Sequence, residues 1–296
     1  CLATGAAKTA MIKYSFSLRP PLGLLILLAA LALLYWAWHL KHPLLLALRP
    51  VETPLLLLAA IGGLRHGWRQ AAGGHRCWGT LTAIACAGLL ITTLVQEARF
   101  QWQRYRVLEA SPILRVLGGH FIIGFRDYAS LAPLAEKGLI GGIYLTRRNV
   151  AGRSIEEVRS EIERLQDLRR AHGLPPLFVA ADQEGGRVNH LSPLLPARPA
   201  LAQLATLKPA QRTRAAYAYG QQHGEELSAI GVNLNLSPVV DLKPDRRGLW
   251  LDTHTLTRQR AISGDAEVVR QIAAAYSAGL QAGGVQATLK HFPGLR

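Results

Sequence analysis

Short apolar runs alternate with helix-forming segments in the second part of the chain, and this alternation limits the fold more than any other feature. The runs are continuously apolar, which is typical of strands buried on both faces of a sheet. There are five of them, at residues 120–125, 141–145, 177–181, 232–236 and 285–289. Strands separated by helices predict an α/β fold, with a parallel sheet covered by helices.

The segments between these runs carry the expected helix signals. Ser154 and Glu157 form an S-x-x-E capping box, which predicts a helix that begins at residue 155 and ends near Gly173. Apolar residues follow the capping box at helical spacing. Further helices are predicted at residues 130–138, 209–230 and 264–280.

Polar residues follow the predicted strands at the points where these end. They are Arg147–Asn149, Asp182–Arg187, Asp241 and the pair Lys290–His291. Ligands bind at the carboxyl ends of strands both in a (β/α)8 barrel and in an open doubly wound sheet. No G-x-G-x-x-G follows the first strand, and the chain has no Walker A sequence and no zinc signature. The sequence therefore predicts neither a cofactor nor a metal.

Two of these strand ends carry distinctive motifs. In DQEGGR, the Asp182 carboxylate can accept hydrogen bonds from sugar hydroxyls, and the glycines allow close backbone approach. In KHFPG, Lys290 and His291 supply two donors next to a turn. The alternative interpretations are a turn cap for Asp182 and a solvated basic pair for Lys290–His291.

Together the motifs resemble glycoside hydrolase family 3, in its bacterial β-N-acetylhexosaminidase (NagZ-like) branch. The resemblance runs from His120 to Gly294 and covers HFIIGF, GGIYLTRRN, DQEGGRV, GVNLNLSPVVDL, RAISGDAEVV and KHFPG in the family's order. It implies a (β/α)8 TIM-barrel-type domain, of which residues 118–296 hold about five of the eight strands. KHFPG favours this branch over the family's β-glucosidases.

The resemblance also implies roles for individual residues. Asp182, Arg260, Lys290 and His291 match residues that bind the terminal sugar, and His190 stands where the family has a further binding arginine. Glu184 is interpreted as structural. The family's acid/base histidine and nucleophilic aspartate are expected beyond Arg296, so no catalytic residue is assigned and the chain is interpreted as an N-terminal fragment.

The implied reaction is retaining hydrolysis that removes terminal β-linked N-acetylglucosamine from peptidoglycan-derived or related glycans. Two alternatives remain open at this point. One is a family 3 β-glucosidase, and the other is a membrane-anchored glycan-binding protein without catalysis. An Asp-x-His and a later strand-end aspartate downstream would favour the enzyme.

Residues 21–96 predict a transmembrane region of two to three helices. Pro21–Leu40 and Trp78–Val95 are uncharged and long enough to span a bilayer. The stretch at residues 43–64 contains Arg49 and Glu52, so it is either a third span or an interfacial hairpin. A cleaved signal peptide is a weaker alternative for the first stretch, because that stretch ends in bulky aromatics.

The basic residues around these stretches favour three spans. Lys13, Arg19 and the loop with Arg65, Arg69 and Arg76 then share the cytoplasmic side, as the positive-inside rule requires. Residues 97 onward are accordingly expected outside the cytoplasm, on a multi-pass inner-membrane protein with the lipid bilayer as a partner. A cytoplasmic barrel domain is the alternative.

The remaining boundaries and the composition complete the prediction. Residues 1–20 are interpreted as a leader with the natural start at Met11, and residues 97–117 as a linker. The net charge of +15 suggests nucleic-acid binding, but basic and acidic residues are interleaved along 155–170, so no nucleic-acid partner is predicted. Three cysteines without metal spacing indicate no disulfide framework.

Overall fold

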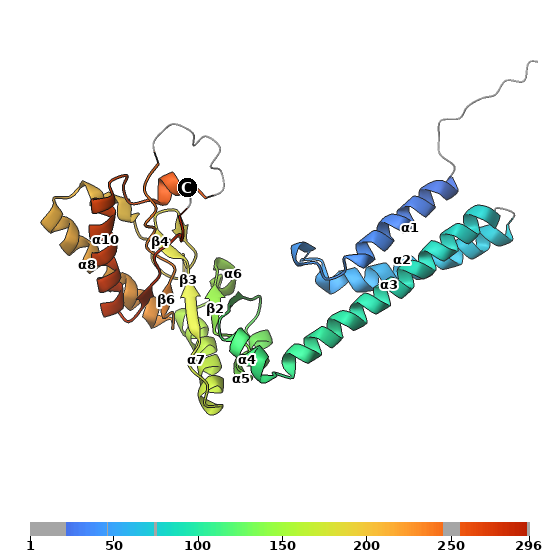
Figure 1. Ribbon diagram of the computed structural model, residues 1–296, viewed down its shortest axis with the longest axis horizontal. Coiled ribbons are helices and arrows are strands. Elements are labelled where there is room, and N and C mark those ends of the chain that lie inside the picture. The colour runs from blue at the N-terminus through green and yellow to red at the C-terminus, as the bar shows by residue number, and fades with distance from the viewer. Residues whose placement is uncertain (1–21, 46, 74–75, 245–254, 295–296) are drawn as a thin grey trace, which may run out of the picture. The chain divides into compact units, whose positions relative to one another are not determined.

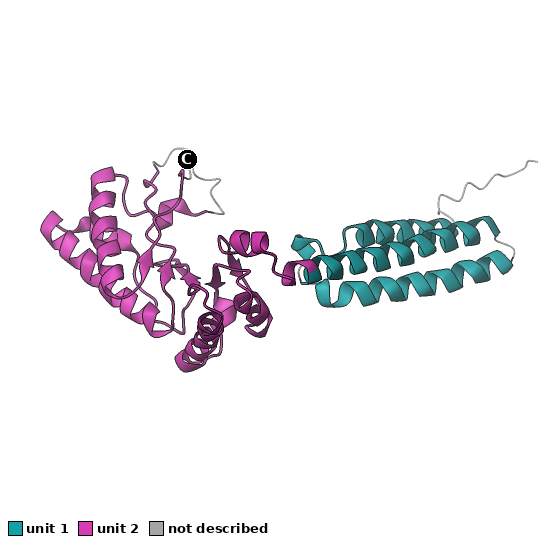
Figure 2. Cartoon of the chain, turned by 60° about the horizontal axis from the view of Figure 1, so that its bottom comes forward, with its two compact units in different colours: residues 1–105 teal, residues 106–296 magenta. Residues whose placement is uncertain are grey.

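The computed structural model describes residues 22–45, 47–73, 76–244 and 255–294. The chain forms two compact units, a helical unit of residues 1–105 and a sheet unit of residues 106–296 (Figure 2). The predicted leader at residues 1–20, including Met11, lies outside the described residues.

The sheet unit contains one parallel five-stranded sheet within its described residues (Figure 1). Ile143 of the second strand pairs with Ile123 on one side and Val179 on the other, so the strands lie in register. The prediction of a parallel sheet is confirmed. In spatial order, the strands are β1 (Ile122–Gly124), β2 (Gly142–Leu145), β3 (Phe178–Ala181), β6 (Leu234–Asn235) and β7 (Gln286–Ala287).

The long helices of this unit begin where the capping residues predict. The Ser154 hydroxyl accepts from the Glu157 N–H at 3.2 Å, and the Glu157 carboxylate accepts from the Ser154 N–H at 2.8 Å. Asp265 caps the last long helix in the same region of the chain as predicted. The helices are α4 (Pro112–Gly118), α5 (Ala132–Glu136), α6 (Arg147–Val150), α7 (Ile155–Ala171), α8 (Pro209–Ala229), α9 (Thr257–Arg260) and α10 (Ala266–Ala282), with 3-10 turns η2 (Ala129–Leu131) and η3 (Leu201–Thr206).

The core of the sheet unit lies between the strands and these helices. Ile143 and Val179 are fully buried on the sheet, and Ile162 of α7 and Tyr276 of α10 are buried in the same cluster. Consecutive residues of β3 are buried from Val179 to Ala181, which fits the continuous apolar runs of the sequence. Because the strands themselves are buried and apolar, polar side chains such as Asp182 lie just beyond their carboxyl ends.

Two details of the sheet unit differ from the sequence expectation. The runs at 232–236 and 285–289 each yield only a two-residue strand. In the first, a side chain replaces part of the backbone ladder, since the Val179 N–H donates to Asn233 Oδ1 at 2.7 Å. A short antiparallel hairpin, β4 (Gln183–Gly185) with β5 (Val188–Asn189), follows β3 directly and was not predicted. Its first strand and its turn lie within the DQEGGR motif, and β5 follows the motif directly.

Long helices make up the helical unit, joined at one end by η1 (Pro43–Leu45). They are α1 (Leu22–Trp38), α2 (Arg49–Ala72) and α3 (Arg76–Leu108). A side chain at Gly67 would meet Gly79, and one at Gly63 would meet Cys86, so α2 and α3 run antiparallel. Gly23 lies against Trp78 and Gly88 against Leu34, so α1 and α3 run parallel. Residues 43–64 do not form the hairpin that was considered for them, because α2 continues as one helix from Arg49 to Ala72.

Glu52 is fully buried at one end of these helices, and its partner is not Arg49. Lys41 donates its backbone N–H to the Glu52 carboxylate at 3.1 Å, and its ammonium lies 3.6 Å from Glu52 and 3.1 Å from Glu97. Arg49 instead donates to the Lys41 carbonyl at 2.9 Å. The helix α3 continues through Leu108, so the first part of the predicted linker at 97–117 is helical.

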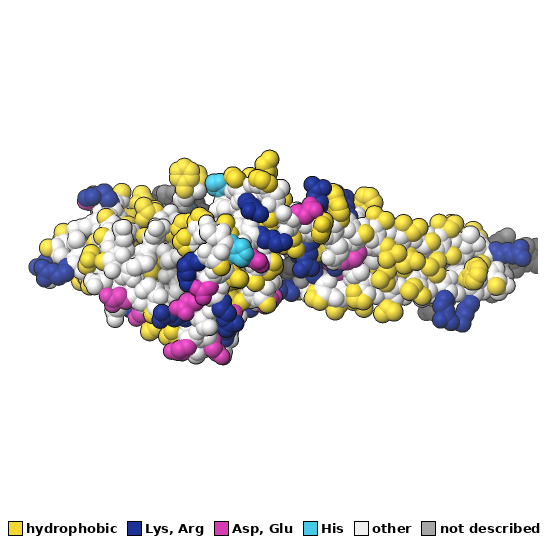
Figure 3. All heavy atoms as spheres, turned by 90° about the horizontal axis from the view of Figure 1, so that it is seen from below, with side chains coloured by type: hydrophobic (Ala, Val, Ile, Leu, Met, Phe, Trp, Pro, Cys, Tyr) yellow, Lys and Arg dark blue, Asp and Glu magenta, His cyan; other side chains and the backbone are white. Residues whose placement is uncertain are grey.

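Large apolar side chains cover the outside of the helical unit, while its interior holds small residues together with Leu56 and Leu89. Leu58 and Ile84 are more than half exposed, whereas Ala60 and Ala85 are buried. Few charged side chains lie between the ends of the helices on the face seen in Figure 3. Among the described helices of at least 18 residues, α3 alone is apolar enough to cross a membrane by length and composition; α1 is apolar but shorter.

Candidate sugar-binding site

Asp182 follows β3 directly, and the hairpin after it turns back toward the end of the sheet. Gly185 and Gly186 have φ angles of +84° and +67°, a backbone conformation that side chains with a Cβ rarely adopt. The backbone conformation of this turn therefore explains why the DQEGGR motif has glycine at both positions. The turn keeps the Asp182 and Glu184 carboxylates at the same strand end.

Lys290 connects these two carboxylates. It lies in the loop after β7, where a parallel bridge with Val239 holds the backbone. Its ammonium forms an ion pair with Asp182 and lies 2.5 Å from Glu184. Lys290 is mostly buried, so the two ion pairs operate with little screening by solvent.

Arg260 and His291 extend the same network. The Arg260 guanidinium donates twice to Glu184, at 2.5 and 3.0 Å, and this bidentate contact raises the pKa of Arg260. One of its nitrogens lies 3.4 Å from His291 Nε2. The other ring nitrogen of His291 lies 2.5 Å from Asp241, which is itself almost buried. Asp241 thereby orients the imidazole.

His190 reaches the network through Tyr144. The Tyr144 hydroxyl lies 3.1 Å from His190 Nδ1 and donates to Asp182 at 3.5 Å. Burial, and then the nearby Asp182 charge, raise the pKa of Tyr144 to about 12, so the hydroxyl stays protonated and can donate. Asp182 therefore contacts Lys290 through one carboxylate oxygen and, through the other, Tyr144, which in turn contacts His190.

The structure thus brings all of the predicted binding residues into one connected network. Asp182, His190, Arg260, Lys290 and His291 are spread over more than a hundred residues of the chain, and each contacts another member or a shared partner. Sequence reasoning missed Tyr144, whose only signal was a polar residue inside an apolar run. It noted Asp241 as a strand-end residue but gave it no role.

A second, buried set of hydrogen bonds fixes the backbone beneath the site. Asn235 of β6 accepts from the Gln183 N–H at 3.1 Å and donates to the Gln183 carbonyl at 2.8 Å. Asn235 also donates to the Tyr276 hydroxyl, which lies 3.0 Å from His223 Nδ1. Helices α8 and α10 therefore hold the residue between Asp182 and Glu184 in place.

His223 should make the stability of the sheet unit depend on pH. Burial, with a smaller effect of Arg198, lowers the pKa of His223 to about 3, so the folded chain keeps it neutral while the unfolded chain protonates it near pH 6.5. The unfolded state then binds more protons as the pH falls. We therefore expect this residue to lower the free energy of unfolding by about 2 kcal/mol when the pH falls from 7 to 5.

Urea unfolding of the whole chain in neutral detergent, followed by circular dichroism at both pH values, measures this effect. His223→Gln should reduce the difference between the two pH values by about 2 kcal/mol. His172→Gln, at an exposed histidine of the same unit, is the matched control and should leave it unchanged. An equal pH dependence in His223→Gln and the original chain would contradict the assignment.

The chemistry of the site fits a polyhydroxylated ligand. Carboxylate oxygens accept hydrogen bonds, and Lys290 after β7 and Arg260 at the end of α9 can donate them. In the parts of the chain that the structure describes, no group of three or more His, Cys, Asp or Glu side chains is placed to hold a metal ion.

Comparison with known proteins identifies the class. The sheet unit has the α/β, TIM-barrel-like arrangement of glycoside hydrolases, and residues 114–295 match the Glycosyl hydrolase family 3 N terminal domain. The chain belongs to this family, and within it the chain is NagZ-like. The family resemblance predicted from the motifs is confirmed.

Individual relatives agree with this assignment. A Beta-hexosaminidase of Xanthomonas euvesicatoria is 36% identical over 159 residues, which are 52% of this chain and 43% of that protein. The chain therefore spans less than half the length of such curated relatives. A Beta-N-acetylhexosaminidase structure from Beutenbergia cavernae is 31% identical, with a TM-score of 0.52, over 62% of this chain and 55% of that one. A family 3 beta-N-acetylglucosaminidase structure from Paenibacillus is 28% identical, with a TM-score of 0.53, over 62% and 34% of the two chains.

Proposed function

We propose that this chain carries the sugar-binding part of a β-N-acetylhexosaminidase that removes terminal β-linked N-acetylglucosamine from peptidoglycan-derived or related glycans. The observation that carries the proposal is the network in which Lys290 joins Asp182 to Glu184 and Arg260 joins Glu184 to His291. The hexosaminidase and N-acetylglucosaminidase relatives support the choice of sugar.

In this proposal the network at the strand ends binds the terminal sugar. Asp182 accepts hydrogen bonds from sugar hydroxyls, Lys290 donates to them, and His291, held between Asp241 and Arg260, contacts the sugar. His190 replaces a forked guanidinium with a shorter imidazole, so it makes one contact where the family arginine makes two. Retaining hydrolysis needs a nucleophile and an acid/base, and no described side chain is assigned either role.

Calorimetric titration of the whole chain in neutral detergent tests the proposed sugar. N-acetylglucosamine should bind, and glucose should bind at least tenfold more weakly. Asp182→Asn should weaken the binding of N-acetylglucosamine, since an amide replaces the carboxylate that accepts from the sugar hydroxyls. Preferential binding of glucose would instead assign the chain to the β-glucosidase branch.

We also propose that the helical unit spans a membrane three times, with α2 antiparallel to both α1 and α3. Small residues allow α2 and α3 to approach closely at Gly67 and Gly79, as in membrane helix pairs. Large apolar side chains face outward, where lipid would cover them, and apart from Leu56 and Leu89 the buried side chains are small or polar. This pattern is the reverse of a soluble helical bundle.

Charged residues at the two ends of α2 support the orientation. The ion-paired group around Lys41 and Glu52 lies at one end, and Arg65 and Arg69 lie toward the other. With the basic end in the cytoplasm, the sheet unit is on the outer side of the inner membrane. Its substrate would then be cell-wall material in place.

Reporter fusions in a bacterial host test this topology. A fluorescent protein that folds only in the cytoplasm should be bright when fused after Gly73. Alkaline phosphatase, which is active only outside the cytoplasm, should be active when fused after Ala110. Alkaline phosphatase activity after Gly73, or a bright fluorescent protein after Ala110, would contradict the three-span arrangement.

A further inference from the structure

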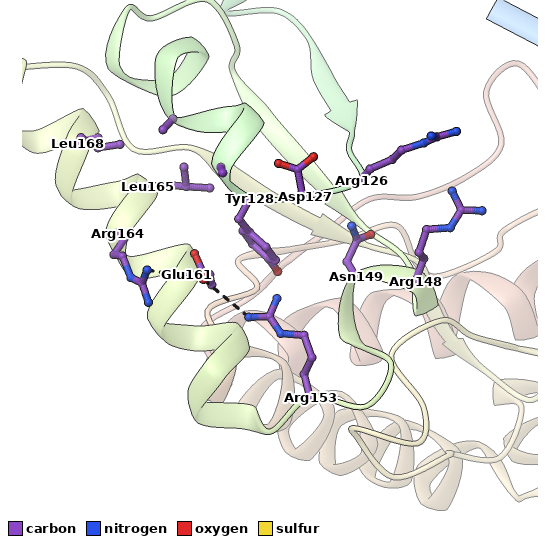
Figure 4. A pocket seen from close by; sticks show the side chains of 12 residues that line it. Arg126, Asp127, Tyr128, Arg148, Asn149, Arg153, Glu161, Arg164, Leu165 and Leu168 are labelled. Carbon is purple, nitrogen blue, oxygen red and sulfur yellow. Dashed lines mark ion pairs between the residues drawn. The ribbon is translucent and has the colours of Figure 1, made fainter. Parts of the chain in front are cut away.

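A cavity of about 530 Å³ in the sheet unit lies between the loop after β1 and helix α7 (Figure 4). The carboxylate of Glu161 in this cavity lies 3.9 Å from Arg153 and 3.6 Å from Arg164. The charges beside α7 are therefore balanced within the protein.

A second cavity, of about 470 Å³, lies toward the end of α2 in the helical unit, and its charges are not balanced in this way. The described residues that line it are Arg65, Trp68, Arg69, Ala71 and Ala72. Both arginines are exposed, and in the described ranges neither side chain forms a hydrogen bond or an ion pair. The single acidic residue of residues 1–96 is Glu52, which lies near the start of α2 and pairs with Lys41. The first 96 residues therefore contain no free carboxylate for these arginines.

The packing of α2 against α3 places Arg65 beside the apolar part of α3. A side chain at Gly63 would meet Cys86. One at Gly67 would meet Ala83. Arg65, midway between these two glycines, is therefore level with the uncharged stretch of α3 and lies roughly 8 Å inside its nearer end. In a membrane, a cation at this depth is costly unless an anion or the headgroup layer reaches it.

Arg65 and Arg69 also point away from the rest of the helical unit. Gly67, which packs on α3, lies two positions from each of them, and such positions are on nearly opposite sides of a helix. The two arginines are one turn apart and so share the outer face. Trp68 lies between them in sequence and is 80% exposed. A partner for this face therefore comes from the surroundings of the helical unit.

We propose that Arg65 and Arg69 bind the phosphate group of an anionic phospholipid in the cytoplasmic leaflet, with Trp68 packed against its glycerol and upper acyl chains. The inference rests on the proposed membrane-spanning arrangement of the helical unit. Guanidinium groups offer forked donors that match phosphate oxygens. Long arginine side chains can extend from the apolar region to the headgroups, and tryptophan is typical of this interface. Two cations without a carboxylate partner favour a lipid with a net negative charge over a zwitterionic one.

Native mass spectrometry of the whole chain in neutral detergent tests the proposal with mixed micelles. The micelles contain phosphatidylglycerol and phosphatidylcholine with the same acyl chains. We expect phosphatidylglycerol to bind at least tenfold more tightly. Glycerol 3-phosphate, which carries the phosphate without acyl chains, should not displace it. Equal binding of the two lipids, or displacement by glycerol 3-phosphate, would overturn the proposal.

Variants separate this site from general attraction to a basic protein. Arg65→Gln with Arg69→Gln should abolish the preference for phosphatidylglycerol. Arg65→Lys with Arg69→Lys should retain most of it, because lysine also carries its charge to the headgroups. Arg159→Gln with Arg170→Gln, on exposed positions of α7, removes the same charge and should leave the preference unchanged. Equal losses in the two glutamine variants would contradict the site.

The lipid site and the membrane topology are decided by separate measurements. The reporter fusions test whether the helical unit spans the membrane three times, whereas the lipid preference is measured in detergent. A chain that passes the fusion test but binds both lipids equally would refute the lipid site and leave the topology standing. Circular dichroism of each variant confirms that its helices are retained.

Discussion

Glu184→Ala is expected to lower the unfolding free energy of the sheet unit by about 3–5 kcal/mol, the usual cost of removing one partner of a buried ion pair. The Glu184 side chain is 5% exposed and holds both Arg260 and Lys290, whose side chains are 14% and 12% exposed. Its removal leaves Arg260 without its carboxylate and Lys290 with Asp182 alone. Urea unfolding followed by circular dichroism measures the change.

Two substitutions make this result specific. Glu267→Ala breaks an ion pair of the same type on the exposed surface of α10, so the unfolding midpoint should hardly change. Glu184→Gln keeps one acceptor and most of the volume, so its effect should be smaller than that of alanine. A Glu184→Ala chain as stable as the Glu267→Ala chain would show that the pairs around Glu184 do not stabilise the fold.

Lys290→Gln is expected to raise the dissociation constant for N-acetylglucosamine about tenfold to a hundredfold, as for the loss of a hydrogen bond from a charged donor. The ammonium both donates to the sugar, in the proposed site, and holds the Asp182 and Glu184 carboxylates together. The measurement is calorimetric titration of folded protein, checked by circular dichroism.

Lys243→Gln is the matched control for this substitution. Lys243 is an exposed lysine in the loop after Asp241, near the same strand ends in sequence, and forms no part of the network. Its substitution should leave the dissociation constant unchanged. Equal effects of the two substitutions would mean that the site responds to overall charge, and no effect of Lys290→Gln would remove Lys290 from the site.

The parallel sheet was predictable because its signals are local. The strands β2 and β3 are apolar throughout, and Ser154 with Glu157 predicts the start of α7 from neighbouring residues alone. The β4–β5 hairpin was not predictable in this way, since Gln183 and Glu184 are polar yet buried. Their burial depends on Asn235 and Arg260, which lie far along the chain.

The candidate site was predictable through its motifs rather than through periodicity. Asp182, Lys290 and His291 stand in DQEGGR and KHFPG, and the parallel sheet brings both motifs to one edge. Tyr144 escaped notice because nothing in GGIYL distinguishes a strand residue that reaches a site from one that lies in the core. Its contact with His190 appears only once β2 and β3 are paired.

The same limit applies to the helical unit. The long uncharged stretches predict α1 and the first part of α3 from composition alone. The pairing of Glu52 with Lys41 rather than Arg49 depends on the turn between α1 and α2, where Lys41 has a φ of +65°. The sequence shows that Glu52 lies near one end of a helical stretch, but it does not show that Lys41 is its partner.

A crystal structure of the whole chain with N-acetylglucosamine tests the central claim most directly. The account predicts the sugar at the carboxyl ends of β3 and β7, with hydroxyls in hydrogen-bond contact with Asp182, Lys290 and His291. A sugar bound elsewhere, or an empty site at a concentration that saturates binding in solution, would contradict it.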